Sequence, residues 1–390
     1  MPAVVICSWE RYLAGIIFLE ATISAGQRKV LGALRKLSQA LESPQDSAQR
    51  IMYLQIQIAL VRIGCDLRLF DILAESPTPL SVDVLSQKTG AAPTLLGRIL
   101  RYLSSHGVIK EIGKNTFTNN KITKTFTYPG FRGGIYHYHD NVGPAIQALP
   151  DFLKENKYQD ITSAVDTPLQ KAWNTNLPAF IWVQSKPENF THFNQFMAGG
   201  RLGMPTWLDA YPYREKTKGL KTEQPFFIDV GGGIGHQAVA LREKLPELPN
   251  QIILQDIPAT LEHAIKHPGI EIVAQDLFEP QTITNARIYY MRNIIHDYPD
   301  DKAIVILKNT ITAMAPDSVI LIDDMVLPDC GVPWQATQID FVMMSTLASQ
   351  ERTHEQWVSL LSKAGLKINK IYTYTASLQD SIIEAVPALM

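Results

Sequence analysis

A glycine-rich loop offers the clearest binding chemistry in this sequence. Residues 226–236 are Phe-Phe-Ile-Asp-Val-Gly-Gly-Gly-Ile-Gly-His, an apolar run that reaches Asp229 and passes into glycines. Glycines allow a tight turn and let a ligand approach the backbone closely. A dinucleotide-binding loop would need glycine at position 236, where this chain has histidine. Because the carboxylate of Asp229 suits an ammonium group better than a pyrophosphate, the pattern favours S-adenosylmethionine over NAD. A purely structural turn is the alternative.

Two further aspartates follow later strands of the same region. Asp256 ends the strand expected at 251–255, about 20 residues beyond the glycines, where an acidic side chain meets ribose hydroxyls. Asp276 ends the strand expected at 270–274 and is placed for an adenine amino group. Each aspartate alone is also compatible with a loop or a helix cap. The carboxyl ends of parallel strands meet at one edge of a sheet, so the three carboxylates together predict a cofactor site there.

His296 could supply a general base at the same edge. It follows the strand expected at 288–291, and an imidazole with a pKa of about 6.5 can accept a proton at neutral pH. Asp324 and Glu351 come after the next strand and loop, and either could orient the imidazole and stabilise its charged form. A histidine without such neighbours would more simply belong to the core or the surface.

The elements around these residues predict an α/β domain over 221–390. Strands are expected at 226–230, 251–255, 270–274, 288–291, 319–323 and 370–374. Helices are expected near 235–246, 258–266, 300–314 and 353–364. This alternation indicates a doubly wound, mostly parallel sheet. Asp323 and Asp324 are adjacent on a strand and would face opposite sides of the sheet, which argues against a metal-binding pair.

Residues 46–125 are expected to form a second, smaller domain. Helical spacing over 51–74 predicts one or two buried helices, interrupted near Gly64. The elements expected after them are helices at 82–89 and 93–103 and strands at 107–111 and 116–118. This order is that of a winged helix, which could bind DNA through its second helix. That helix offers only Arg98 and Arg101 as basic residues, so a packing or dimerisation module is favoured.

Two regions flank this domain. Residues 1–45 are expected to form a helical extension that breaks at Pro44, and residues 126–220 a helical linker rich in aromatic residues. Such density is typical of a core, but aromatic walls would also suit a planar, apolar substrate. On an extended segment His137 and His139 would face the same side, as a metal requires. No third ligand is identified, so no metal is predicted.

Composition narrows the partners. The chain has 390 residues, 46% of them hydrophobic, which is enough for two or three domains. Lys and Arg number 36 against 38 Asp and Glu, a net charge of −2 that disfavours nucleic acid. Charged residues interrupt the apolar start of the chain, so we expect an amphipathic helix there, with neither a targeting segment nor a membrane span. Three widely spaced cysteines, Cys7, Cys65 and Cys330, indicate a reducing, cytoplasmic location.

Together these motifs resemble the plant and fungal O-methyltransferases of the caffeic-acid type, in the branch that acts in fungal secondary metabolism. The resemblance covers most of the chain and implies a Rossmann-like domain that binds S-adenosylmethionine, preceded by a winged-helix dimerisation domain, and hence a homodimer. The candidates for cofactor binding are Asp229, Gly231, Gly232, Gly233, Asp256, Asp276, Leu277 and Arg292. The candidates for catalysis are His296, Asp324 and Glu351. The candidates for substrate contact are Asp297, Met343 and His139. The family usually has glutamate in place of Asp324, lysine in place of Arg292 and tryptophan in place of Tyr298.

The resemblance implies direct methyl transfer without a metal. The hydroxyl of an aromatic or enolic small molecule would lose its proton to His296 as its oxygen attacks the sulfonium methyl group. A phenol differs from an ordinary imidazole by about 3.5 pKa units, roughly 5 kcal/mol, which is less than the about 7–11 kcal/mol that positioning supplies. One alternative is a family member that keeps the cofactor but catalyses a dehydration or pericyclic reaction. Another is a non-catalytic regulatory protein built on the winged helix.

Overall fold

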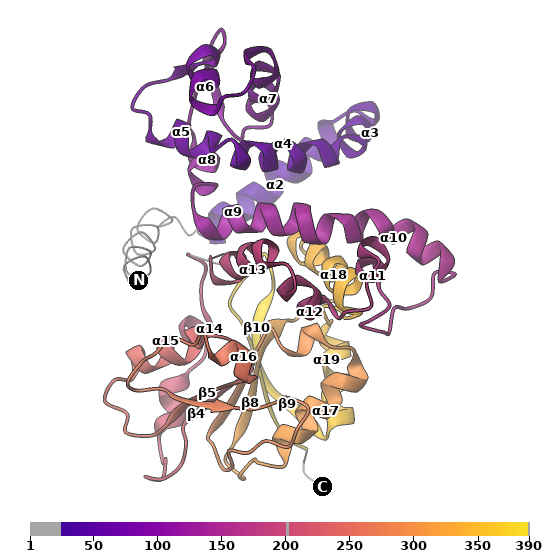
Figure 1. Cartoon of the computed structure of the whole chain (residues 1–390). Helices are drawn as coiled ribbons and strands as arrows, with labels where there is room; N and C mark the ends of the chain where they lie inside the picture. The colour runs from indigo at the N-terminus through magenta and orange to yellow at the C-terminus, as the bar shows by residue number, and fades with distance from the viewer. Residues whose placement is uncertain (1–24, 200–202, 389–390) are drawn as a thin grey trace. The chain divides into compact units, whose positions relative to one another are not determined.

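The chain folds into two compact units. The computed structural model describes residues 25–199 and 203–388 (Figure 1). One unit comprises the described residues up to Gln147 together with Phe180–Met204, and the other comprises Ala148–Ala179 and the described residues from Pro205 onward. The region expected as one linker, 126–220, is therefore shared between the two units. The amphipathic helix expected at the start of the chain lies outside the described residues.

The first unit begins with four helices, α2 (Ala25–Leu41), α3 (Pro44–Met52), α4 (Leu54–Asp66) and α5 (Leu69–Glu75). The chain breaks at Ser43 and Pro44 as predicted, and the Ser43 side chain accepts the N–H of Asp46 to cap α3. The predicted interruption of the helical segment is present but lies slightly later than Gly64, because α4 continues through this glycine. The break lies at Arg68, which has a left-handed backbone with φ of 50°. Gly64 instead makes room for a neighbour, since a Cβ there would lie 2.7 Å from Cζ of Phe70.

The predicted winged-helix order is present. Helices α6 (Val82–Thr89) and α7 (Pro93–Ser105) are followed by the hairpin β2 (Lys110–Gly113) and β3 (Thr116–Thr118), and β1 (Leu80–Ser81) completes a sheet of order β1-β3-β2. Ser81 caps α6, and Gly90 ends it with φ of 73°. The buried side chains of α4 to α7 and of the hairpin form one core.

Two helices that pack closely at glycines complete the first unit. α9 (Pro129–Tyr136) follows α8 (Lys121–Thr125) and packs along α13 (Pro187–Gly199), while α12 (Ala179–Gln184) precedes α13. A Cβ at Gly130 would lie 2.6 Å from the backbone of Gly199, so the two helices touch backbone to backbone.

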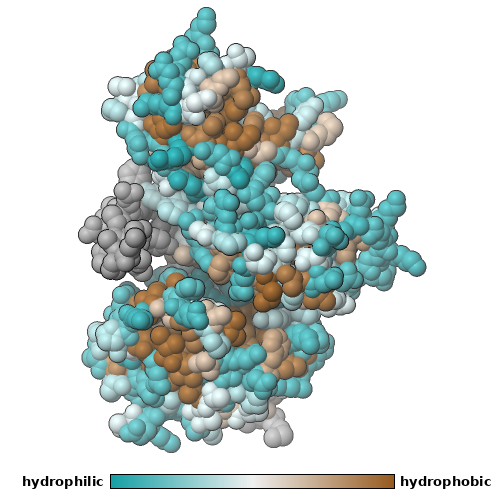
Figure 2. Space-filling model, viewed as in Figure 1, coloured by the Kyte–Doolittle hydropathy of each residue, from teal (hydrophilic) through white to brown (hydrophobic). Residues whose placement is uncertain are grey.

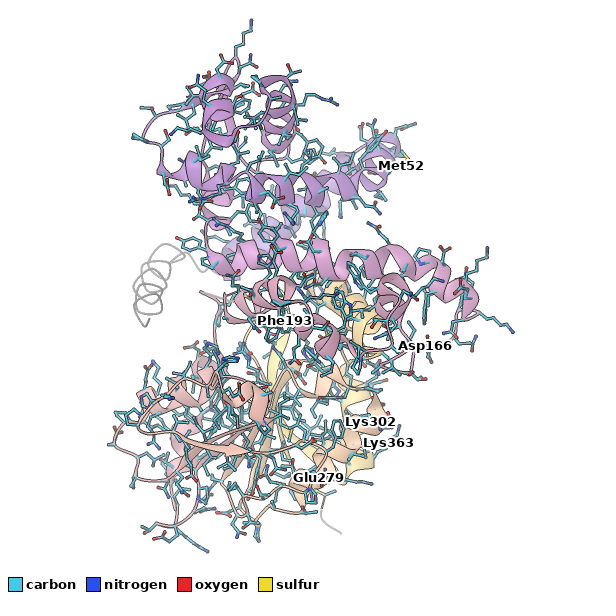
Figure 3. All side chains as sticks on the ribbon, in the orientation of Figure 1. Met52, Asp166, Phe193, Glu279, Lys302 and Lys363 are labelled. Atoms are coloured by element: carbon cyan, nitrogen blue, oxygen red, sulfur yellow. The ribbon has the colours of Figure 1, made fainter. Side chains whose placement is uncertain are left out.

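His137 and His139 do not lie on an extended segment, and that expectation is wrong. Residues His137–Val142 form a single π-helical turn, η1, which continues α9 into α10 (Gly143–Glu155). In a helix, alternate residues do not share a face, so the argument that His137 and His139 point the same way fails. The His137 ring lies 5.3 Å from that of Phe193 (labelled in Figure 3), and burial lowers the pKa of His137 to about 4.

The second unit is built on a seven-stranded sheet. Its strands are β4 (Phe227–Val230), β5 (Ile252–Asp256), β6 (Glu271–Ala274), β7 (Ile288–Arg292), β8 (Val319–Met325), β9 (Leu366–Thr373) and β10 (Asp380–Pro387). They lie in the order β6-β5-β4-β7-β8-β10-β9, and of these seven strands β10 alone runs in the direction opposite to the others. The predicted doubly wound, mostly parallel sheet is confirmed. The strand β10 was not predicted.

Helices cover both faces of this sheet. The helices that follow its strands along the chain are α15 (His236–Lys244), α16 (Pro258–Leu261), α17 (Asp300–Ile311), α18 (Trp334–Leu347) and α19 (His354–Ala364). The shorter helical elements of the unit are α11 (Pro168–Trp173), α14 (Trp207–Ala210), η2 (Tyr213–Thr217) and η3 (Ile295–Asp297). One core packs α17 and α19 against the sheet, and the other packs α14 and α15. The helix expected at 258–266 is confined to Pro258–Leu261, and α18 was not predicted.

Candidate active site

The loop between β4 and α15 depends on glycine at successive positions. Gly231, Gly233 and Gly235 have φ of 69°, 61° and 92°, a region that other residues rarely adopt. A Cβ at Gly231 would lie 2.7 Å from Cδ1 of Ile294, and a Cβ at Gly232 would lie 2.4 Å from Cγ of Asp229. The loop is therefore bare backbone, and a ligand that rests on it meets peptide groups rather than side chains.

Asp229 ties this loop to the helix that follows. It is buried in β4, and its Oδ2 accepts the N–H of Ala238 in the first turn of α15 at 3.1 Å. Burial raises the pKa of its carboxyl to about 7, against the opposing effects of the Ala238 N–H and of Arg292. A cation bound in the loop would favour the charged carboxylate.

The structure brings Asp256 and Leu277 to the same loop. Asp256 Oδ2 accepts the N–H of Gly233 at 2.9 Å, so the end of β5 is joined to the glycines. The side chain of Leu277 borders the loop, since a Cβ at Gly231 would lie 3.6 Å from its Cδ2. Asp276 lies at the exposed rim, where its Oδ1 accepts the N–H of Phe278 at 2.9 Å.

These residues lie around the topological switch point of the sheet, where the order of the strands reverses. From β4 the chain moves to β5 and β6 on one side, and it returns to β7 on the other side. Open α/β sheets bind ligands outside the carboxyl ends of the strands at such a point. The glycine loop follows β4, and the His296 turn follows β7, so both lie at this edge.

His296 lies in η3, directly beyond β7. Its ring is buried, and Nδ1 lies 2.7 Å from Oε1 of Glu351. Glu351 thus fixes the orientation of the imidazole and leaves Nε2 as the nitrogen available to a substrate. The carboxylate of Asp297 lies beside that nitrogen, with 3.4 Å between Oδ1 and Nε2.

Asp324 acts on the backbone of the same turn. Its Oδ2 accepts the N–H of His296 at 3.2 Å, and its Oδ1 makes no hydrogen bond with any described residue. The sequence left open which acid orients the imidazole, and the structure assigns the ring contact to Glu351. Asp323, on the opposite face of β8, accepts the hydroxyls of Tyr290 and Tyr374.

The acids change the basicity of His296. Burial opposes protonation of the imidazole, but the carboxylates of Glu351, Asp297 and Asp324 outweigh burial and raise its pKa to about 10. Burial in turn raises the pKa of Asp297 to about 6 and that of Asp324 to about 8. The carboxylates therefore favour the protonated form of His296.

Two residues that the sequence reasoning missed hold the turn in place. The guanidinium of Arg352 is fully buried and donates to the carbonyl of Ile295 at 3.0 Å and to that of Tyr298 at 2.9 Å. The hydroxyl of Ser349 donates to the carbonyls of His296 and Tyr298. The available signal was that Arg352 directly follows Glu351 in the sequence.

Arg292 ends β7 at the same edge. Its Nε lies 3.6 Å from Oδ2 of Asp323, and Nε is buried without a hydrogen bond to any described residue. Burial opposes its charge, but Tyr290 and Asp323 outweigh burial and raise its pKa. A half-buried guanidinium whose Nε donor is unused suits a ligand carboxylate.

Met343 and His139 are the two remaining candidates for substrate contact. Met343 is half-buried on α18, the helix that packs on η3. His139 belongs to the first unit, where its Nδ1 lies 2.6 Å from Oδ1 of Asp140, which also pairs with Arg62.

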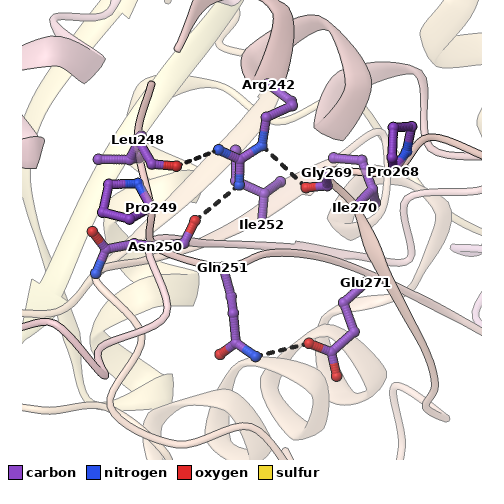
Figure 4. A pocket seen from close by; sticks show the side chains of 10 residues that line it. All are labelled: Arg242, Leu248, Pro249, Asn250, Gln251, Ile252, Pro268, Gly269, Ile270 and Glu271. Carbon is purple, nitrogen blue, oxygen red and sulfur yellow. Dashed lines mark hydrogen bonds between the residues drawn. The ribbon is translucent and has the colours of Figure 1, made fainter. Parts of the chain in front are cut away.

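A separate hollow lies at the opposite ends of β5 and β6 (Figure 4). It measures about 390 Å³, and Arg242 dominates its wall. The guanidinium donates to the carbonyls of Gly269, Leu248 and Asn250, so its polar groups join two loops, the one before β5 and the one before β6. Arg242 therefore has a structural role here, and its hydrogen-bond donors are already used within the protein.

The described part of the chain contains no group of three or more His, Cys, Asp and Glu side chains that could hold a metal ion. Within the same residues, every helix is too short or too polar to cross a bilayer.

Comparison with known proteins decides the family. Residues 52–128 match the O-methyltransferase dimerisation domain, and residues 214–367 match the O-methyltransferase domain. The demethylsterigmatocystin 6-O-methyltransferase of Aspergillus parasiticus is 42% identical over 368 residues, which cover 94% of each chain. The chain belongs to the O-methyltransferase family. The predicted family resemblance is confirmed.

Other O-methyltransferase relatives show that the family scaffold carries more than one activity. The O-methyltransferase lepI of Aspergillus flavus is 38% identical, with 91% of this chain and 93% of that one covered. Two solved structures, described as a pericyclic reaction enzyme and as LepI in complex with SAM, match at 35% identity with a TM-score of 0.89. Each covers 98% of this chain and all of its own.

Proposed function

We propose that this O-methyltransferase transfers a methyl group from S-adenosylmethionine to a hydroxyl of an aromatic or enolic small molecule of secondary metabolism. The observation that carries the proposal is the contact of 2.7 Å between Nδ1 of His296 and Glu351, which leaves Nε2 for the acceptor at the cofactor edge of the sheet. The enzyme acts as a cytoplasmic homodimer, with residues 52–128 matching the family dimerisation domain.

Each group of cofactor-binding residues contacts a different part of S-adenosylmethionine. The backbone of Gly231, Gly232 and Gly233 cradles its methionine end, Asp229 favours the positive charge there, and Arg292 offers its free donors to a carboxylate. Asp256 takes the ribose hydroxyls, while Asp276 and Leu277 border the adenine. When bound, S-adenosylmethionine supplies an electrophilic methyl group on a sulfonium. The bare cradle and the unused donors of Arg292 are the features of this structure that fit it.

His296 accepts the acceptor's proton at Nε2, and Asp297 beside it helps to orient the hydroxyl. The raised pKa of His296 brings the basicity of the neutral imidazole closer to that of a phenolate, so a neutral His296 is well suited to take the proton of a phenol. The cost lies instead in deprotonating His296 beforehand, because the carboxylates around it favour the imidazolium. A positive charge bound at the neighbouring loop reduces that cost, because it disfavours the imidazolium.

Acceptor specificity is the least constrained part of the proposal. Met343 on α18, the helix that packs on the turn carrying His296, is one candidate contact for the acceptor, and His139 is a second candidate. The aromatic side chains of residues 126–220 favour a planar, largely apolar acceptor.

One specific observation favours a second function. The imidazolium of His296, surrounded by three carboxylates, is a hydrogen-bond donor, and two similar structures of this scaffold include one described as a pericyclic reaction enzyme. On this alternative His296 donates a proton or a hydrogen bond, and the cofactor is bound without losing its methyl group.

Product analysis separates the two functions. The enzyme is incubated with methyl-labelled S-adenosylmethionine and a panel of polycyclic phenols and enols. Methyl transfer yields labelled product together with an equal amount of S-adenosylhomocysteine. Conversion of an acceptor with no S-adenosylhomocysteine would contradict methyl transfer and support the alternative. The His296→Ala variant should keep cofactor binding and lose most turnover.

A further inference from the structure

Asp323 is a buried carboxylate that the proposed methyl transfer does not use. It lies in β8, is 1% exposed and faces the side of the sheet opposite to that of Asp324. Its Oδ1 accepts the hydroxyl of Tyr374 at 2.6 Å, and its Oδ2 accepts the hydroxyl of Tyr290. A buried charge is costly unless it is hydrogen-bonded, so these two hydroxyls allow the carboxylate to stay in the interior.

The register of the strands brings Arg292 beside this carboxylate. Arg292 and Asp323 are partners in the parallel pair of β7 and β8, so their side chains lie on the same face of the sheet. Nε of Arg292 lies 3.6 Å from Oδ2 of Asp323, which is close enough for an ion pair but too long for a hydrogen bond. The charge of the guanidinium is thus balanced, while its Nε donor is left unused.

The guanidinium of Arg292 lies near the glycine loop. Burial raises the pKa of Asp229, in the strand before the loop, and the charge of Arg292 opposes that rise. Burial lowers the pKa of His236, the first residue of the helix after the loop, and the charge of Arg292 lowers it further. Arg292 therefore acts on both ends of the loop that is proposed to hold the methionine end of S-adenosylmethionine.

The hydroxyl of Tyr290 occupies the carboxylate oxygen that faces Arg292. Oδ2 of Asp323 accepts this hydroxyl and is also the oxygen 3.6 Å from Nε of Arg292. Without the hydroxyl, Oδ2 would be a buried oxygen without a hydrogen bond, and the unused Nε donor would satisfy it after a small movement. Guanidinium–carboxylate hydrogen bonds are strong, so this internal pair would compete with a ligand carboxylate for Arg292.

We propose that Tyr290 is a positioning residue that keeps Asp323 from hydrogen-bonding to Arg292 and so leaves the guanidinium for the carboxylate of S-adenosylmethionine. Tyr374 holds the other oxygen of Asp323 in the same way. Asp323 balances the charge of the half-buried Arg292, and the two hydroxyls prevent the ion pair from closing. The arrangement sets the preference of the site for a cofactor with a free carboxylate. It rests on the proposed cofactor site but not on methyl transfer.

The neighbouring tyrosine of β7 offers a matched control. Tyr289 is buried as completely as Tyr290, but its hydroxyl donates to the carbonyls of Ile283 and Ala313, both at 2.9 Å, on the other face of the sheet. Both tyrosines and Asp323 are at most 1% exposed, so changing them leaves unaltered the mixture of hydrophobic (brown) and hydrophilic (teal) residues on the surface in Figure 2. Any effect on ligand binding then originates in the interior.

The test measures the affinity of each variant for S-adenosylmethionine and for decarboxylated S-adenosylmethionine by calorimetry. The two ligands differ only in the carboxylate, so a change in the ratio of their dissociation constants reports on the binding of that group. We expect the wild type to favour S-adenosylmethionine by ~10–100-fold. Tyr290→Phe should reduce this preference at least ~5-fold, because Asp323 then binds Arg292, whereas Tyr289→Phe should leave it within about twofold.

A double variant separates competition from a general loss of structure. Adding Asp323→Asn to Tyr290→Phe removes the competing anion, so the preference should return to within about threefold of the wild type. Thermal unfolding of all variants is recorded in parallel. Tyr290→Phe and Tyr289→Phe should both be less stable than the wild type, since each loses a buried hydrogen bond, but only the first should change the preference.

Three outcomes would overturn the proposal. An unchanged preference in Tyr290→Phe would assign its hydroxyl to the core alone. A double variant with a weaker preference than Tyr290→Phe would show that Asp323 assists the ligand instead of competing with it. Equal affinity of the wild type for both ligands would mean that Arg292 does not bind the carboxylate. A wild type that binds neither ligand would reject the proposed cofactor site itself, whereas binding without methyl transfer would reject only the proposed reaction.

Discussion

Glu351 and Arg352 are consecutive in the chain, and both hold the turn that carries His296. Glu351 binds the imidazole at Nδ1, while Arg352 binds the carbonyls of Ile295 and Tyr298 on either side of it. The orientation of the ring and the position of its backbone therefore depend on one short segment. The backbone of that segment is itself paired with the end of β8 through Leu327.

Glu351→Gln tests the control of basicity. Burial disfavours the imidazolium, but the carboxylates raise the pKa of His296 to about 10, so the neutral base is scarce below that pH. With the wild type, kcat/KM should rise with pH toward about 10. Removing the charge of Glu351 lowers the pKa, so the rising limb should move to lower pH, and the maximal rate should fall at least ~100-fold. A pH–rate series measures both, and a profile identical to that of the wild type would contradict the assignment.

Arg352→Lys and Arg352→Met test the backbone clamp. Lysine keeps the charge but not the geometry that reaches two carbonyls, so both variants should lower kcat by ~10–100-fold while KM for the cofactor changes little. Thermal unfolding is recorded in parallel, because a fully buried arginine also supports the fold. A loss of stability with normal kcat at low temperature would assign Arg352 a structural role only.

Asp256→Asn tests the link between β5 and the glycine loop. The amide replaces an oxygen that accepts the N–H of Gly233, and it removes a charge beside the proposed ribose site. We expect the affinity for S-adenosylmethionine to fall ~10–100-fold, or about 1.4–2.8 kcal/mol, as measured by calorimetry. Asp329→Asn, an exposed aspartate in the loop after β8, serves as the control and should bind normally.

Gly231→Ala tests the bare cradle. Its φ of 69° costs any other residue about 1 kcal/mol, and its Cβ would also meet Ile294 at 2.7 Å. Gly219→Ala has φ of 70° and open space around the new Cβ, so it carries the backbone cost alone. We expect both variants to lose stability in thermal unfolding, the Gly231 variant more, and only that variant to lose cofactor binding. Equal binding by the two would contradict a loop that contacts ligand.

The parallel half of the sheet and the glycine loop were predictable because local signals mark them. Buried parallel strands such as β4 and β7 are short apolar runs, and Asp229 and Asp256 end two of them. The strand β10 could not be predicted because Asp380 and Glu384 interrupt its apolar pattern. Glu384 is buried yet satisfied, by Tyr211 at 2.5 Å and Lys216 at 2.8 Å, contacts that no local pattern reveals.

The residues of the site could be predicted from the sequence, but the contact that each of them makes could not. His296, Asp324 and Glu351 do come together, yet only the structure shows that one acid binds the ring and the other the backbone. Arg352 was missed because its role depends on carbonyls, which every residue has. The π-turn at His137 was missed because an irregular helical turn has no distinctive spacing.

The position of β10 between β8 and β9 has a consequence for synthesis. A chain emerging from the ribosome can pair β4, β5, β6, β7 and β8 in turn, but β9 has no neighbour until residues 380–387 have also emerged. Until then β8 remains an open edge, which is prone to pair with other chains. The two strands beyond β8 therefore join the sheet only after residues 380–387 have been synthesised. Premature termination even a few residues before Asp380 would leave an aggregation-prone edge beside an otherwise folded domain.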